Sequence, residues 1–310
     1  MIKFKAFGRL PAMAYFFLLI FFHILILRKK IIIVCDQYGR LGNRLFLFSQ
    51  LIEIHRKTGR EIWMPGFHDY KHYFESTKST RFIRYPEKNI PNPFSIEETF
   101  LSFNRIHKLF KNSFLSKVIP VLEYYSMDQG NPIERILSEK NRCLLFKGFI
   151  FHEYFLSHKS INYKIRESFL PSSEYEKLIN EPICKLREKN EVLCGVLVRQ
   201  TDYRTWNDGK CFYSSMRYAK ILNDTKIAFK NKTLSFFIAT DEKQDHGLYE
   251  GLDFIIRVGH PIENLYSLSK CDFLIGPPSS YVAWASLYGN IPLFTITDQF
   301  RCPVPSSLKL

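Results

Sequence analysis

The second half of the chain contains five short apolar runs separated by stretches with helical spacing. The runs cover residues 192–198, 234–240, 253–258, 272–276 and 291–296, and the helix-like stretches lie near 211–223, 244–250, 262–270 and 279–289. Apolar runs of this length that alternate with helices are typical of parallel strands covered on both faces. The pattern predicts a doubly wound parallel sheet, and no other feature constrains the fold as strongly.

A similar pattern precedes it in the first half. Residues 31–35 (IIIVC) form a continuous apolar run, residues 44–57 have helical spacing that stops before Gly59, and residues 61–65 (EIWMP) resemble a second strand. Strand, helix and strand in this order form a βαβ unit. Residues 143–151 (CLLFKGFIF) then resume strand character.

These two patterns predict an α/β chain with two Rossmann-like, doubly wound parallel-sheet domains. We expect an N-terminal, acceptor-side domain in residues 31–189 and a C-terminal domain in residues 190–310. Only short helices are expected around residues 97–126, where the pattern is weak. A chain of 310 residues is long enough for each domain to bury a core of its own.

The first thirty residues contain a hydrophobic segment. Within residues 10–27, His23 is the one side chain that can carry a charge near neutral pH, and three basic residues follow at 28–30. A helix over this segment reaches about 27 Å, close to the roughly 30 Å of a bilayer core. We therefore expect residues 1–30 to hold an N-terminal hydrophobic helix that associates with a membrane, as a single-pass or monotopic anchor. A helix that is buried or lies at an interface is the alternative.

Charge and cysteine content narrow the class of partner. The formal net charge is +14, and the first thirty residues hold six basic residues and no acid. A basic body suits an anionic partner such as a phosphate-bearing small molecule. The seven cysteines include no CxxC pair, and Cys35, Cys194 and Cys271 lie in or near apolar runs. These features indicate reduced thiols, no metal site and a body that faces the cytosol.

Polar residues follow four of the predicted strands, where doubly wound sheets bind their ligands. After the first strand, Gly39 and Gly42 let the backbone approach a ligand closely, and Asn43 can cap the helix that follows. The loop lacks the G-x-G-x-x-G spacing of dinucleotide-binding proteins. A plain strand-to-helix connection is therefore the alternative.

Arg199 stands at the end of the apolar run 192–198, and Asp202 follows three residues later. A guanidinium is always charged and offers paired donors that suit a phosphate. Asp202 could hold this guanidinium or accept a hydrogen bond from a ribose hydroxyl. An internal ion pair at the sheet edge is the alternative.

Two more strands end in comparable groups. Asp241 could accept hydrogen bonds from a base or a ribose, or it could be an acid favoured by a helix dipole. Ser279 and Ser280 stand where a helix begins, and its amide groups could bind a phosphate unless the serines are plain N-caps. The convergence of such groups at one sheet edge favours a ligand site.

Five stretches together resemble a known family. They are GRLGNRLFLFSQL, CLLFKGFIFHEYF, VLVRQTDYR, FIATDE and ENLYSLSKCDFLIGPPSSYVAWASLYGN. They occur in the order seen in the GDP-fucose-dependent fucosyltransferases of the α-1,2 type, and related α-1,6 and protein O-fucosyltransferases share looser versions. The resemblance covers most of residues 33–295 apart from 66–141. It implies a GT-B fold and a glycosyltransferase that moves fucose from GDP-fucose to a glycan hydroxyl, with inversion and without a metal or cofactor.

The resemblance also implies roles for particular residues, with the nucleotide on the second half of the chain and the acceptor on the first. Arg199 would contact the diphosphate of the donor as a catalytic residue, and Asp202 and Tyr203 would complete its loop. Asp241 would lie near the nucleoside. The other residues implied to bind the donor or to approach the reaction centre are Ser279, Ser280, Tyr281, Gly39, Arg40, Gly42 and Asn43.

The sequence departs from the family at Leu197, Gln200, Thr201 and Pro278, so a donor other than GDP-fucose is an alternative. No D-x-D arrangement stands at a predicted strand end, and a guanidinium with a helix N-terminus can stabilise a departing diphosphate without a metal. Candidates for the general base in the first domain, which the sequence does not rank, are His68, Asp69, His72, His152 and Glu153.

Other functions stay open on the sequence alone. Residues 68–85 mix basic and aromatic side chains as nucleic-acid-binding surfaces do, but no nucleic-acid motif accompanies them, and we expect no nucleic-acid partner. A membrane-anchored protein that binds a nucleotide sugar or a glycan without catalysis fits the departures from the family. An oxidoreductase is disfavoured because the dinucleotide fingerprint is absent.

Overall fold

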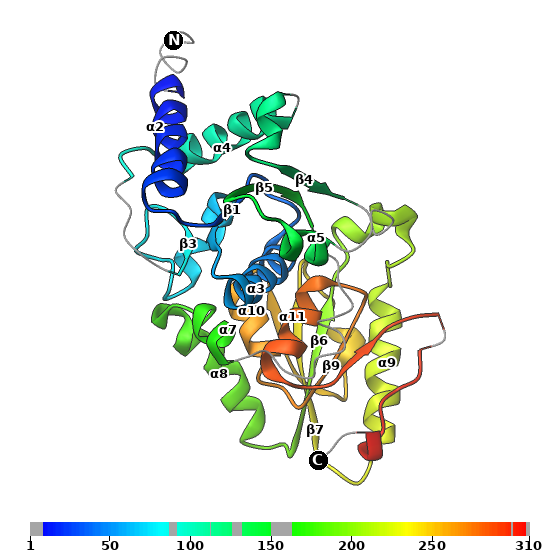
Figure 1. Ribbon diagram of the computed structural model, residues 1–310. Coiled ribbons are helices and arrows are strands. Elements are labelled where there is room, and N and C mark those ends of the chain that lie inside the picture. Colours follow the sequence, from blue (N-terminus) through cyan, green and yellow to red (C-terminus); the bar gives the residue numbers. More distant parts are fainter. Residues whose placement is uncertain are drawn as a thin grey trace, which may run out of the picture. The chain divides into compact units, whose positions relative to one another are not determined.

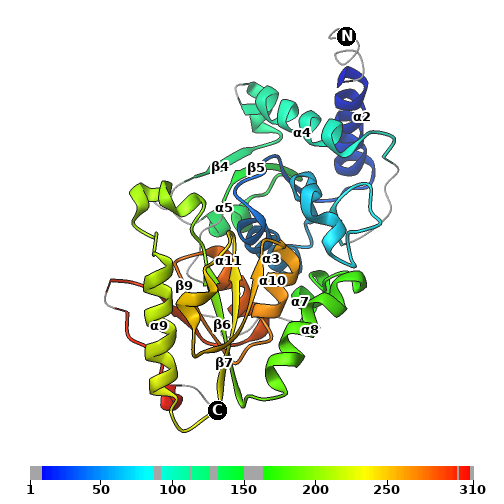
Figure 2. The same cartoon turned by 180° about the vertical axis from the view of Figure 1, so that it is seen from behind.

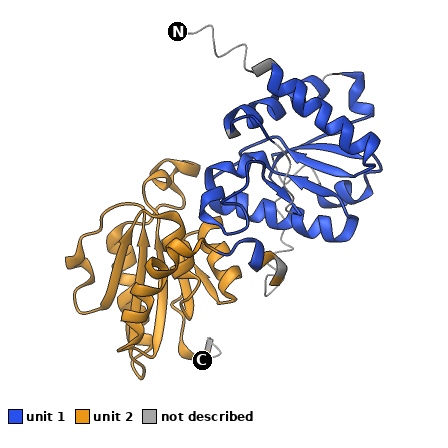
Figure 3. Cartoon of the chain, turned by 90° about the vertical axis from the view of Figure 1, so that its left-hand side faces the viewer, with its two compact units in different colours: residues 1–157, 167–170 blue, residues 158–166, 171–310 orange. Residues whose placement is uncertain are grey.

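The computed structural model describes residues 9–86, 92–111, 113–125, 132–149, 163–298 and 300–307 (Figure 1). The chain divides into two compact units (Figure 3). The first contains residues 1–157 and 167–170, and the second contains residues 158–166 and 171–310. Each unit has a five-stranded sheet of its own.

The sheet of the first unit has the strand order β3-β2-β1-β5-β4. Its strands are β1 (Ile31–Val34), β2 (Glu61–Trp63), β3 (Arg84–Tyr85), β4 (Val121–Tyr124) and β5 (Cys143–Gly148). β3 runs antiparallel to β2, and the other neighbours are parallel. Every residue of β1 is buried, as expected for an apolar strand at the centre of a sheet covered on both faces.

Helices cover both faces of this sheet (Figure 1). On one side, α2 (Arg9–Phe21) and α4 (Ile96–Lys111) supply core side chains, and α3 (Leu41–Thr58) and α5 (Pro132–Ser138) lie on the other. α3 ends at Thr58 and is capped by Gly59, whose φ of 68° is left-handed and whose amide donates to the carbonyl of His55. The helix expected between the first two strands is therefore confirmed.

The N-terminal hydrophobic segment belongs to the core of the first unit. It forms the 13-residue helix α2 and a five-residue π-helix, η1 (Phe22–Ile26). Phe16 and Ile20 are at most 1% exposed, and the ring centroid of Phe16 lies 4.9 Å from that of Phe103 on α4. In the part of the chain that the structure describes, no helix is long and apolar enough to cross a membrane. The predicted transmembrane helix over residues 10–27 is thus wrong, because the i, i+4 stripe of this segment docks onto protein.

The sheet of the second unit has the strand order β10-β9-β6-β7-β8, and all of its neighbours are parallel. Its strands are β6 (Val192–Val198), β7 (Leu234–Thr240), β8 (Asp253–Val258), β9 (Phe273–Gly276) and β10 (Leu293–Thr295). Every residue of β6 and β7 is buried. The parallel sheet predicted from the five apolar runs is confirmed.

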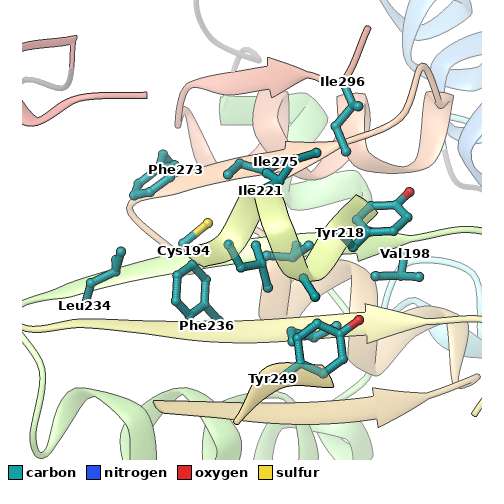
Figure 4. Close-up of a cluster of buried hydrophobic side chains, with 14 of the residues drawn as sticks. Cys194, Val198, Tyr218, Ile221, Leu234, Phe236, Tyr249, Phe273, Ile275 and Ile296 are labelled. Carbon is teal, nitrogen blue, oxygen red and sulfur yellow. The ribbon is translucent and has the colours of Figure 1, made fainter. Parts of the chain in front are cut away.

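Helices also cover both faces of the second sheet. α9 (Ser215–Ala228) lies on one side, and α8 (Glu176–Arg187) and α10 (Pro261–Leu268) lie on the other (Figures 1 and 2). Tyr218 and Ile221 of α9 pack with Cys194, Phe236 and Ile275 in one buried cluster (Figure 4). The last long helix, α11 (Ser280–Gly289), follows β9.

Two further segments differ from the sequence prediction, and the two-residue strand β3 was not predicted. α8 lies in the second unit, where the hydroxyl of Ser267 on α10 donates to the carbonyl of Ile179, whereas the predicted boundary at residue 189 assigned this helix to the first domain. β4 forms at residues 121–124, where only short helices were expected, and alternates between half-buried and buried positions. An alternating four-residue segment is too short to show its period in a sequence.

Candidate functional site

The second sheet has a topological switch point between β6 and β9. From β6 the chain proceeds to β7 and β8 on one side, and it then returns to β9 and β10 on the other side. Open sheets of this kind bind ligands at the carboxyl ends of the two strands that flank the switch point. Arg199 directly follows β6, and Ser279 follows β9. Both residues therefore stand at the position where a ligand is expected.

The guanidinium of Arg199 connects the two loops at this point. Its Nε donates to Oδ1 of Asp202 at 3.0 Å, and its Nη2 donates to Oδ2 at 2.6 Å. Its Nη1 donates to Oγ of Ser279 at 3.1 Å. A guanidinium has five N–H groups, so these bonds leave two for a ligand. The ion pair that the sequence left as an alternative is present, and it does not use the whole donor set.

Arg199 is held in a largely buried position. Its side chain is 19% exposed, and its Cζ lies 4.4 Å from the ring centroid of Tyr203, which is a cation–π distance. Burial lowers the pKa of the guanidinium, but the hydrogen bond to Asp202 and the nearby charges outweigh it, so the pKa lies above its ordinary value. The guanidinium is therefore permanently charged, and its orientation is fixed.

α11 begins beside this guanidinium. Ser279 is its N-cap, and Oγ of Ser279 accepts from the amide of Tyr281 at 3.2 Å as well as from Arg199. A Cβ on Gly276 would lie 3.2 Å from Cβ of Leu197 and 3.3 Å from Val282, so a residue without a side chain lets α11 start close to β6. Ser280 is the first residue of the helix, where the dipole favours an anion.

The two tyrosines of the predicted site anchor its loops. Tyr203 is 3% exposed, and its hydroxyl donates to the carbonyl of Pro278 at 2.6 Å. The hydroxyl of Tyr281 donates to the carbonyl of Pro261 at the start of α10, and burial raises its pKa. Both hydroxyls are occupied by backbone carbonyls, so these residues position the site by contacts within the protein.

Asp241 fixes the loop that carries Arg199. Its Oδ1 accepts from the amide of Gln200 at 2.9 Å. Its Oδ2 accepts from the amide of Thr201 at 3.2 Å and from the hydroxyl of Thr201 at 2.6 Å. A carboxylate that holds three donors of one loop is a structural element of that loop. In this structure Asp241 lies at the predicted edge with its oxygens directed to Gln200 and Thr201.

A buried network of side-chain amides lies under the same loop, and no motif in the sequence indicated it. Gln200 is 2% exposed; its Nε2 donates to the carbonyl of Tyr213 at 2.8 Å, and its Oε1 accepts from Gln244 at 3.0 Å. Gln244 is 9% exposed and also donates to the hydroxyl of Thr240. Leu197 is buried too. Two of the positions that depart from the resembled family thus face the interior.

A second ion pair stands at this edge. Arg204 donates to both carboxylate oxygens of Glu242, at 2.6 and 2.9 Å, and its side chain is 49% exposed. Together with Asp202 and Asp241, the site contains three carboxylates beside two guanidinium groups. The negative charges of these carboxylates therefore oppose the binding of an anionic ligand to the remaining donors of Arg199.

The glycine loop predicted for the first unit lies at the carboxyl end of β1. Gly39 has a φ of 65°, and a Cβ there would lie 2.1 Å from Nδ2 of Asn43, so this position requires glycine. α3 begins at Leu41 with Arg40 as its N-cap, which places Gly42 and Asn43 inside its first turn. The predicted capping role of Asn43 is therefore wrong. Its amide instead covers Gly39.

Arg44 organises the neighbouring loops and was not identified from the sequence. Its side chain is 8% exposed and donates to the carbonyl of Gly66 at 2.7 Å and to Oδ2 of Asp69 at 2.8 Å. A basic residue within the apolar helix 41–58 was the available signal. Buried arginines are paired in this way because an unpaired buried charge is costly.

His68 and Asp69 form a dyad beside Arg44. Nε2 of His68 lies 2.6 Å from Oδ1 of Asp69, and Nδ1 of His68 lies 2.9 Å from the carbonyl of Pro65. Nε2 of Gln37 also lies 3.3 Å from Nδ1 of His68. The ring of His68 is therefore held by contacts with three neighbouring residues. His72 is exposed, and His152 and Glu153 lie outside the described residues.

A cavity of about 890 Å³ lies elsewhere in the second unit. It is lined by residues from the amino ends of β7 and β8, from the second half of α9 and from the turn that follows α9, including Lys226, Lys230 and Asp253. This is the edge of the sheet opposite to Arg199. Among the described residues, no group of three or more His, Cys, Asp or Glu side chains could hold a metal ion.

Comparison with known proteins adds the fold family. The sequence matches no protein-family model and no curated protein sequence. The structure is similar to a mutant of FUT1 from Arabidopsis thaliana in complex with GDP, with a TM-score of 0.58 and 13% identity over 90% of this chain and 73% of that chain. The chain therefore has a fucosyltransferase fold.

Two structures of NodZ share this fucosyltransferase fold. The α-1,6-fucosyltransferase NodZ soaked with GDP-fucose has a TM-score of 0.52 and 14% identity, over 91% of this chain and 98% of that one. The fucosyltransferase NodZ from Bradyrhizobium has a TM-score of 0.51 and 14% identity, over 86% and 95%. The resemblance noted in the sequence is confirmed at the level of the fold.

Proposed function

We propose that this protein is a glycosyltransferase that moves fucose from GDP-fucose to a hydroxyl group of a glycan, with inversion at the transferred carbon, without a metal ion and with an α-1,2 linkage. The observation that carries the proposal is the bond between Arg199 and Ser279, which joins a buried cation to a helix N-terminus at the switch point of the second sheet. The FUT1 and NodZ structures of the same fold contain GDP or were soaked with GDP-fucose.

The proposed role of Arg199 follows from the place where negative charge develops on the donor during transfer. When the bond between fucose and phosphate breaks, the departing GDP gains negative charge at the diphosphate. The two remaining N–H groups of Arg199 and the first turn of α11 offer positive potential at that place. Because Asp202 and Tyr203 hold the guanidinium before the donor binds, no reorganisation is needed during the reaction.

The other predicted site residues either position Arg199 and the start of α11 or belong to the side that binds the second substrate, the acceptor. Asp241 holds the loop 199–201, and Tyr281 holds the start of α11 against Pro261. Gly39, Arg40, Gly42 and Asn43 belong to the loop of the first unit that we assign to the acceptor side. Transfer itself requires the acceptor hydroxyl to lose its proton as the fucosyl carbon accepts its oxygen.

The test is a donor screen with the purified full-length protein. Release of nucleoside diphosphate from GDP-fucose, GDP-mannose and UDP-galactose is measured with and without methyl β-galactoside, and each reaction is repeated with EDTA. We expect release from GDP-fucose, acceleration by the acceptor, and the same rate in EDTA. Release from another donor alone overturns the assignment of GDP-fucose, and loss of activity in EDTA overturns the metal-free mechanism.

A second function, binding of the nucleotide sugar without transfer, is favoured by one observation. Both guanidinium groups at the site are already paired with carboxylates. The same screen separates the two functions, because calorimetric binding of GDP with no release from any donor, with or without acceptor, supports the second.

A further inference from the structure

The first unit has a switch point of its own, and polar and aromatic side chains gather beside it. From β1 the chain proceeds through α3 to β2 on one side, whereas β5 lies on the other side of β1. Asp36 and Tyr38 follow β1, Tyr125 directly follows β4, and Phe149 directly follows β5. Sheets of this class bind ligands at such a point, and none of these four residues was predicted from the sequence as a site residue.

Three of the four residues form an aromatic platform. The rings of Tyr38 and Phe149 are stacked at a centroid distance of 5.4 Å and an interplanar angle of 21°. Tyr125 lies 6.3 Å from Tyr38 at an angle of 43°, and it is 50% exposed. Since the rings of Tyr38 and Phe149 already stack on each other, the ring of a ligand cannot insert between them. The platform therefore offers one aromatic surface at the edge of the sheet.

Asp36 supplies hydrogen-bond acceptors beside this platform. Its Oδ1 accepts from the amide of Gln37 at 2.8 Å, and its Oδ2 accepts from the hydroxyl of Tyr125 at 3.5 Å. A carboxylate has about four acceptor positions, so about two remain for a ligand. Burial, and then the charge of Asp36, raise the pKa of Tyr125 to about 12, so its hydroxyl keeps its proton at neutral pH.

We propose that Asp36, Tyr38 and Tyr125 form a binding subsite for one hexose ring, the end of the acceptor glycan. A hexose ring presents a face of C–H groups and a rim of hydroxyls. The C–H face packs on exposed aromatic surface, and two neighbouring hydroxyls donate to the remaining positions of the carboxylate. The inference rests on the proposed function and names the residues that hold its second substrate.

The experiment uses the full-length protein and two readouts. Affinity for methyl β-galactoside, methyl β-glucoside and methyl β-mannoside is measured by ligand-observed NMR, and the KM of the acceptor is measured in the transfer reaction. GDP affinity and GDP-fucose hydrolysis without acceptor serve as donor-side controls. The variants are Asp36→Asn and Tyr125→Ala, with Phe114→Ala as the matched control, because Phe114 is an aromatic residue of the same unit that is 80% exposed.

We expect Asp36→Asn and Tyr125→Ala each to weaken hexoside binding and to raise the acceptor KM about tenfold, while GDP affinity stays unchanged. Phe114→Ala should change neither. Unchanged hexoside affinity in both variants, or no binding of any hexoside to the wild type, overturns the subsite. A parallel loss of GDP affinity overturns it in favour of a nucleotide site. If no donor is turned over but hexoside binding is lost in the variants, the proposed function fails and the subsite stands.

Discussion

The guanidinium of Arg199 donates to the hydroxyl oxygen of Ser279 at 3.1 Å, although 80 positions separate the two residues in the chain. The bond joins the end of β6 to the N-cap of α11 across the switch point of the second sheet. Because the same guanidinium also binds Asp202, its orientation is set before any ligand arrives. This arrangement leads to the first two predictions.

Replacement of Arg199 should affect turnover more than folding. If the proposed transfer takes place, we expect Arg199→Ala to lower kcat by about 10²–10³, as loss of one charge-stabilising donor does in enzymes. Arg199→Lys should recover little of this, because an ammonium cannot reproduce the planar set of bonds to Asp202 and Ser279. Arg187→Ala is the control, since Arg187 makes a comparable two-bond pair with Asp272 at the opposite edge. Equal kinetic losses in Arg199→Ala and Arg187→Ala would exclude a specific role for Arg199.

The carboxylate of Asp202 lies beside the donors that remain for an anionic ligand, so its negative charge should weaken the binding of GDP. We expect Asp202→Asn to lower the Kd of GDP by about three- to tenfold at low salt, an effect that falls as ionic strength rises. Glu242→Gln removes the partner of Arg204 and shows how much a carboxylate farther from Arg199 changes the Kd of GDP. Calorimetry of GDP binding provides the values. A weaker affinity in Asp202→Asn would mean that Asp202 acts chiefly by positioning Arg199.

The inner face of α2 should contribute strongly to the stability of the first unit. Phe16 is fully buried against Phe103, so Phe16→Ala should lower the free energy of unfolding by about 3–5 kcal/mol. Leu18 is 70% exposed on the same helix, and Leu18→Ala should change it by less than about 0.5 kcal/mol. Denaturant unfolding of the two variants tests this pair. Equal effects would contradict the docked position of α2.

Stability should fall in mild acid because of one buried histidine. Burial, and then the charge of Lys147, lower the pKa of His107 to about 4, against about 6.5 for an unfolded chain. Between these values the unfolded state binds a proton that the folded state does not, so stability is complete above about pH 6.5 and decreases as the pH falls towards 4. The loss at pH 5 should be about 2 kcal/mol.

The histidine prediction is tested by a matched pair of variants. His107→Gln should remove this part of the decrease between pH 7.5 and pH 5, whereas His72→Gln should keep it, because His72 is exposed. Urea unfolding at both pH values gives the decrease in the free energy of unfolding for each variant. The prediction fails if His107→Gln shows the same decrease as the wild type.

The regular part of the fold could be predicted because its signal is local. β6, β7 and β9 are apolar runs whose residues are all buried, and helices separate them. β3 and β4 were missed because a strand of two residues, or one of four with alternating burial, carries too little periodicity. The helix α2 was misread because a segment that is apolar on all sides has the same composition whether it meets lipid or protein.

The candidate site could be predicted only where strand ends reveal it. Arg199, Asp241 and Ser279 each follow a buried strand, and the structure brings them to one edge. The sequence could not show that Asp241 would direct its oxygens to the backbone of Gln200 and Thr201, because that depends on how two loops pack. Gln244, Arg44 and Asp36 were missed for the same reason, since their partners are distant in the chain or are backbone groups.

The docked position of α2 has a practical consequence for preparing the protein. Removing an N-terminal hydrophobic segment is a common way to obtain the remainder of a membrane-bound transferase in solution. In this chain, deletion of residues 1–30 would uncover the aromatic cluster that contains Trp63, Phe82 and Phe103, all of which are at most 4% exposed. A shortened protein of that kind would expose an apolar surface and aggregate, whereas in the intact chain α2 covers this surface.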